Sequence, residues 1–84
     1  MEDSYNTLTS LEKIQLIKSH IKNLQHVKYN LELSILAEQA VDVPNETSII
    51  GYQMQIDDAI DKENALLEEL NKIEQEEIII ENGA

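Results

Sequence analysis

The sequence has no cysteine, arginine, tryptophan or phenylalanine, and it has only one proline and two glycines. Without cysteine it can form no disulfide, thiolate zinc site or cysteine nucleophile. With no arginine, and with six lysines against 17 acids, it is not expected to bind nucleic acid directly. The two glycines, Gly51 and Gly83, are too far apart to form a phosphate-binding loop. We therefore expect no catalytic residue and no cofactor, and predict that the protein is not an enzyme.

Long hydrophobic runs are also missing. No segment approaches the roughly 20 apolar residues that span a bilayer. The first residues are acidic, whereas a secretory signal would begin with basic residues. These features predict a cytoplasmic protein that has no membrane partner.

Aliphatic side chains supply most of the apolar content that is present. Ile, Leu and Val make up 25 of 84 residues, which favours a folded chain over a disordered one even at a net charge of −11. Residues 1–84 are expected to form one small domain. Because so short a chain buries little apolar surface by itself, self-association is also expected.

A long helix is predicted over about residues 10–40. Apolar residues recur there at spacings of three and four: Ile14, Ile17, Ile21, Leu24, Leu31 and Ile35. A single polar residue, Lys28, interrupts this pattern. Thr9 and Glu12 have the spacing of a capping box at its start. The residues before it are expected to fray.

A turn at residues 41–47 separates this helix from a second one. Pro44 disfavours helical geometry at Val43, and either Asn45 or Thr47 can cap the next helix. The apolar pattern resumes over about residues 48–80, again with one polar position near its middle, Glu63, among Ile49, Tyr52, Ile56, Ala59, Leu66, Leu70 and Ile73. Two long helices joined by a short turn predict an all-α, coiled-coil-like antiparallel hairpin.

The two lone polar positions predict how the helices pair. In an antiparallel hairpin, the residue numbers of two facing residues have a constant sum. A sum of about 91 places Lys28 opposite Glu63, and the two side chains would fix the register as an ion pair. The same sum pairs Ile35 with Ile56, Leu31 with Ile60, Leu24 with Leu67, and Ile21 with Leu70. The alternative is that Lys28 and Glu63 reach solvent separately.

Charge should also favour this arrangement. Residues 44–84 hold 11 acids and 2 lysines, whereas residues 1–43 hold 6 acids and 4 lysines. The hairpin is expected to bring Lys18 and Lys22 near Glu68 and Glu69. Exposed pairs of this kind contribute only tenths of a kcal/mol.

A second apolar stripe lies outside the predicted seam and consists of Tyr29, Leu33, Leu36 and Ala40. On the second helix, Met54, Ile60 and Leu67 widen the apolar surface. Two helices cannot cover stripes this wide, so we predict a homodimer that forms a four-helix bundle. The alternative is a monomer with a few exposed leucines. The consecutive isoleucines Ile78 to Ile80 leave the pattern, as a frayed helix end or a segment that docks elsewhere.

Several acids and both histidines are candidates for metal binding. Asp57, Asp58 and Asp61 match the DDxxD string of prenyl-transferring enzymes, which requires a large helical cavity that this chain cannot form. His20 and His26 are six residues apart, so they do not share a helix face. We expect no metal site, and a solvated acidic face instead.

Part of the first predicted helix, NLQHVKYNLELS (23–34) followed by AEQAV (37–41), resembles small helical proteins of unknown function encoded by tailed phages that infect cyanobacteria. The resemblance implies a phage accessory protein, and the expected cytoplasm would then be that of the host cell. It does not include the acidic second helix and carries over no functional residue.

Three functions fit these features, and all have a protein as the partner. The first is a non-enzymatic interaction or assembly module that binds its partner through Tyr29, Leu33 and Leu36. The second is an acidic inhibitor or nucleic-acid mimic that occupies a basic groove through an acidic surface including Asp57, Asp58, Asp61, Glu68 and Glu69. The third is a small helical chaperone for apolar segments of assembling proteins.

Overall fold

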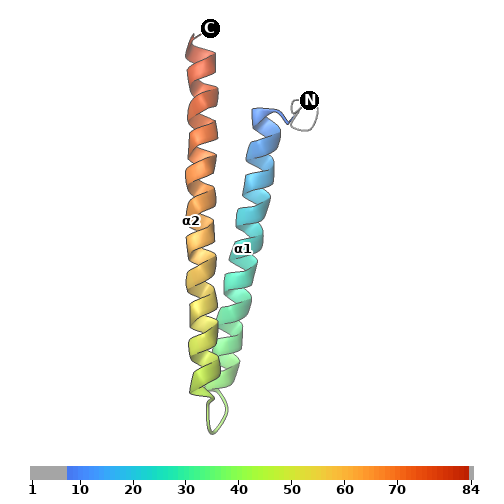
Figure 1. Cartoon of the computed structure of the whole chain (residues 1–84). Coiled ribbons are helices and arrows are strands. Elements are labelled where there is room, and N and C mark those ends of the chain that lie inside the picture. The colour runs from blue at the N-terminus through green and yellow to red at the C-terminus, as the bar shows by residue number, and fades with distance from the viewer. Residues whose placement is uncertain (1–7, 84) are drawn as a thin grey trace, which may run out of the picture.

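The computed structural model describes the backbone of residues 8–83 and the side chains of residues 8–76. Two helices, α1 (Ser10–Gln39) and α2 (Glu46–Gly83), pack against each other as an antiparallel hairpin (Figure 1). Residues 8–83 contain no strand. The predicted all-α hairpin is confirmed. The predicted fraying of the first residues mostly concerns residues 1–7, which lie outside the described part of the chain.

The start of α1 is fixed by the predicted capping box. The Glu12 backbone N–H donates to the Thr9 hydroxyl at 3.1 Å, and the Thr9 backbone N–H donates to the Glu12 carboxylate, also at 3.1 Å. These bonds satisfy two donors that a helix start leaves free. The hydrogen bond from the Thr9 backbone lowers the pKa of Glu12 below its ordinary value of 4.5.

The turn is tied to both helices by hydrogen bonds. Asn45 caps α2, because its side-chain oxygen accepts the Ser48 backbone N–H at 3.1 Å. The Asn45 backbone N–H donates in turn to the Glu38 carboxylate of α1 at 2.9 Å. Capping by Asn45 instead of Thr47 explains why α2 begins at Glu46, two residues before its predicted start.

The seam between the helices contains the side chains that the spacing predicts. On α1 they are all buried or half-buried: Ile14, Ile17, Ile21, Leu24, Lys28, Leu31 and Ile35. The same holds on α2 for Ile49, Tyr52, Ile56, Ala59, Glu63, Leu66, Leu70 and Ile73. Ala59 is the most deeply buried of them, as expected for a small side chain between two close helices.

Two of the predicted residue pairs are wrong. Ile60 and Leu67 were expected opposite Leu31 and Leu24, but both are exposed, and Ala59 and Leu66 occupy the seam instead. The constant sum aligns residues along the helix axes, but it does not set their angle around them. The apolar spacing predicts Ala59 and Leu66 for the seam, so the error lies in using the constant sum to choose the facing residues.

The expected ion pairs of Lys18 and Lys22 are also absent. Among the described side chains, the ion pairs are Lys28 with Glu63, and Lys72 with Glu69 within α2. Glu69 is therefore paired along its own helix, three residues from Lys72, and not across the seam. Long exposed side chains gain little from a cross-helix pair because water screens the charges.

The end of α2 departs from the predicted boundary. Its backbone stays helical to Gly83, so it is longer than α1 and continues past the first turn of α1 (Figure 1). The side chains of Ile78 to Ile80 lie outside the described residues, and so does any docking by them.

The hydrophobic core of a single hairpin is thin. Within the described residues, only Ile21, Ile49, Ala59, Leu70 and Ile73 are buried, and none of them is completely enclosed. Many large apolar side chains remain exposed on both helices and in the turn. The hairpin therefore leaves much of its apolar surface in contact with solvent.

Candidate protein-interaction surfaces

Lys28 and Glu63 meet in the middle of the seam. The Lys28 Nζ lies 2.6 Å from the Glu63 Oε1, and these side chains are only 27% and 12% exposed. Gln25 donates a longer hydrogen bond of 3.4 Å to the other Glu63 oxygen. The predicted contact between Lys28 and Glu63 is present, and the alternative in which both side chains reach solvent separately is wrong.

The Lys28 ammonium group changes the titration of its partner. Its hydrogen bond to the carboxylate lowers the pKa of Glu63 below the ordinary value of 4.5. Partial burial acts in the opposite direction, and the Gln25 amide adds a smaller lowering effect. Glu63 is thus held in its charged form beside Lys28.

This pair also divides the hairpin surface into two broad faces. Tyr29 follows the seam residue Lys28, and Asn64 follows the seam residue Glu63. One position is about 100° of helix rotation, so in an antiparallel pair of helices Tyr29 and Asn64 lie on the same face. Val27 and Lys62 each precede a seam residue by one position and lie on the other face. We call these the Tyr29 face and the groove face.

The Tyr29 face carries the apolar stripe that the sequence indicated. Tyr29, Leu33 and Leu36 are all exposed, and Tyr29 and Leu36 are more than half exposed. Ala40, at the end of the stripe, is also exposed. The stripe is thus an apolar surface that the hairpin itself does not cover.

The acids of α2 lie on different sides of the helix. Asp57, Asp61 and Glu68 lie within about 60° of Asn64, which places them toward the Tyr29 face. Asp58 instead lines a recess on the groove face. Glu69 lies eleven residues after Asp58, or about three helical turns, and so it lies on the same side of α2. All five carboxylates are exposed. The structure therefore does not gather the predicted acids into one surface.

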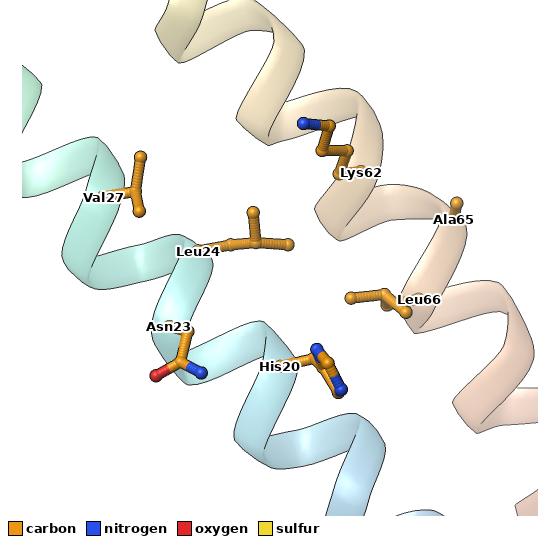
Figure 2. A pocket seen from close by; sticks show the side chains of 7 residues that line it. All are labelled: His20, Asn23, Leu24, Val27, Lys62, Ala65 and Leu66. Atoms are coloured by element: carbon orange, nitrogen blue, oxygen red, sulfur yellow. The ribbon is translucent and has the colours of Figure 1, made fainter.

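The groove face has a recess that the sequence analysis missed. It has a volume of about 470 Å³ and is lined by His20, Asn23, Leu24, Val27, Lys62, Ala65 and Leu66. Figure 2 shows Leu24 and Leu66 pointing into the space between the helices, with His20 and Lys62 beside them. A smaller recess lined by Gln55, Asp58 and Ala59 continues it, because both share Leu24, Val27 and Lys62.

One sequence signal could have revealed this groove. Val27 belongs to neither predicted stripe, yet it lies one turn from Leu24 on the side facing away from Tyr29. On α2, Ala65 lies beside the seam residue Leu66, where a small side chain leaves room for a recess.

The other candidate ligands stay apart. His20 lines the groove, whereas His26 lines a separate shallow hollow beside Tyr29. Within the described part of the chain, no three histidine, aspartate or glutamate side chains come together in a way that could hold a metal ion. Across residues 8–83, neither helix has an apolar stretch long enough to cross a membrane.

Comparisons of the chain with protein-family models, with curated proteins and with solved structures found no match.

Proposed function

We propose that this chain is a non-enzymatic interaction module that associates with itself and holds one other protein. The observation that carries this proposal is the exposed stripe of Tyr29, Leu33 and Leu36 on one side of α1. Aromatic and aliphatic side chains at helical spacing suit a partner helix laid along the same face. Contiguous exposed apolar surface of this kind marks interaction sites on small proteins.

The environment of the acids supports a non-enzymatic role. A general acid or base at neutral pH needs a carboxyl group whose pKa is raised by desolvation. Asp57, Asp58, Asp61, Glu68 and Glu69 are exposed instead. Glu63, which is mostly buried, has a lowered pKa and is paired with Lys28.

Self-association is part of the proposal because the core of one hairpin is so thin. With five buried residues among those described, a hairpin of this size has little apolar burial to offset the entropy of folding. A second copy would cover further apolar surface and complete a four-helix bundle.

The acidic inhibitor is the second candidate function, and one observation favours it. Asp57, Asp61 and Glu68 lie on the same side of α2, and none of them forms an ion pair among the described residues. A basic groove on another protein would find a row of free carboxylates there. The chaperone function has no observation of its own in its favour.

A pull-down at low and high salt tests the proposal. The wild-type chain, the variant Leu33→Glu and the triple variant Asp57→Asn, Asp61→Asn, Glu68→Gln are each immobilised and incubated with an extract of the cells in which the protein acts. The captured proteins are identified by mass spectrometry. An interaction module retains its partner at high salt and loses it in Leu33→Glu, because apolar contacts are not screened.

The inhibitor gives the opposite pattern. Its partner dissociates as salt rises and is lost in the triple variant, while Leu33→Glu still binds it. If no protein is captured specifically in any arm, both functions are contradicted.

A further inference from the structure

Few charges surround the main recess of the groove face, although the chain as a whole carries a net charge of −11. Two acids of α2 lie beside it on this face: Asp58 lines the smaller recess together with Lys62, and Glu69 pairs with Lys72. None of the seven residues that line the main recess is an acid, and Lys62 is the only charged side chain among them besides the titratable His20. From Leu16 to Ser34, the α1 residues on this face are Leu16, His20, Asn23, Val27, Asn30 and Ser34, which include no carboxylate and no lysine. A second copy placed over the main recess would therefore bring few like charges together.

The Tyr29 face is much less suited to a second copy. Its acids Asp57, Asp61 and Glu68 would lie close to the same acids of an identical chain. Like charges brought together at an interface disfavour association. The same acids would favour a different partner, one that presents basic residues beside its apolar ones.

The size of the groove face meets the needs of a stable dimer. The 30 residues of α1 extend about 45 Å, and two helices side by side are about 20 Å wide. Such a face offers about 900 Å², and a standard protein interface buries roughly 800 Å² per partner. The area would suit either broad face, so charge is what distinguishes them.

We propose that a second copy of this chain packs against the groove face, so that the recess lined by Leu24, Val27 and Leu66 is filled by apolar side chains of the other hairpin. This inference rests on the self-association in the proposed function and specifies its surface. The Tyr29 face then stays free for a different protein. The dimer would present two such faces on opposite sides of a four-helix bundle.

Two matched substitutions on α1 test this assignment. Val27 on the groove face and Leu33 on the Tyr29 face are 46% and 43% exposed, so Val27→Glu and Leu33→Glu place the same charge at equally exposed sites. The mass of each variant is measured by light scattering across a dilution series, with circular dichroism as a check of helix content. We expect Val27→Glu to weaken the dimer roughly 100-fold or more, because a carboxylate would replace an apolar side chain inside the interface. Leu33→Glu should keep the dimer mass.

A second pair of variants keeps the test valid if Val27→Glu fails to fold. Since the chain has no cysteine, Ala65→Cys in the groove and Asn64→Cys on the Tyr29 face can each carry one environment-sensitive dye. Raising the protein concentration should shift the dye emission to the blue at position 65 and leave it unchanged at position 64.

The outcomes separate the two proposals. A dimer that survives Val27→Glu, or a dye shift at position 64 alone, overturns the groove assignment and leaves self-association standing. A wild-type chain that stays monomeric at high micromolar concentration overturns self-association and the groove assignment together, while capture of a partner through the Tyr29 face would still stand.

Discussion

The seam and the broad faces of this hairpin use similar residues for different purposes. In the seam, isoleucine and leucine are buried between the helices, and Lys28 and Glu63 are held together at 2.6 Å. On the broad faces, residues of the same types, such as Leu33, Leu36 and Leu67, remain exposed. The seam defines the fold of one chain, whereas the faces have apolar surface that only another molecule can cover.

The two broad faces differ in turn by charge. The groove face has a recess whose lining includes no acid and has Lys62 as its charged side chain besides the titratable His20, and the Tyr29 face combines an apolar stripe with the carboxylates of Asp57, Asp61 and Glu68. In the proposed function, the apolar content of each face provides the contact with a partner. The charge beside it decides whether that partner can be a second copy of the same chain.

The largest expected effect on stability comes from truncating the seam. Ile21→Ala removes a buried side chain and should lower the free energy of unfolding by about 2–3 kcal/mol, measured by urea denaturation at one protein concentration. Leu36→Ala, on the Tyr29 face, should change it by less than about 0.5 kcal/mol because Leu36 is mostly exposed. Equal effects at the two positions would break the distinction between seam and face.

A smaller effect is expected from the titration of Glu63. Because its pKa in the folded chain is below 4.5, the ion pair stabilises the fold above that value, and the contribution is lost as pH falls through the lowered pKa. Urea unfolding measured from pH 6 down to about pH 3 should therefore show a pH-dependent contribution that Glu63→Gln removes.

Glu69→Gln is the matched control for this titration. The Glu69 Oε1 lies 3.8 Å from the Lys72 Nζ, and both side chains are exposed. Removing the Glu69 carboxylate should therefore leave the pH profile almost unchanged. A double-mutant cycle on Lys28→Leu and Glu63→Leu should show coupling between the two side chains. Parallel profiles for wild type and Glu63→Gln, together with no coupling, would contradict a register role for the pair.

The smallest expected effect is at Gly51, near the turn. A methyl group added there meets no atom within 4 Å in the hairpin, so Gly51→Ala should stabilise it by about 0.5–1 kcal/mol through helix propensity. The reverse change at an exposed helix position, Ala37→Gly, should destabilise it by a similar amount. Thermal unfolding of both variants measures these effects. Destabilisation by Gly51→Ala would mean that the groove interface with the second copy extends to the turn.

Local patterns allowed much of the hairpin to be predicted. The spacing of isoleucine and leucine predicted both helices, and Thr9 with Glu12 predicted the start of α1 to the residue. The single polar positions Lys28 and Glu63 predicted the alignment of the helices, because a charged side chain in an apolar seam is destabilising unless an opposite charge faces it. The exposed stripe of Tyr29, Leu33 and Leu36 was also predicted from spacing.

What the constant residue sum could not supply was the rotation of each helix about its own axis. This rotation places Ala59 and Leu66 in the seam, as the apolar spacing predicts, and not Ile60 and Leu67, as the sum predicts. It also brought Leu24, Val27, Ala65 and Leu66 around one recess, and it distributed the acids of α2 between two sides. The sequence by itself determined two amphipathic helices, their caps and their alignment, since these depend on neighbours three or four residues apart. Only the tertiary structure decided which side chains share a face, because that depends on how one packed helix is turned against the other.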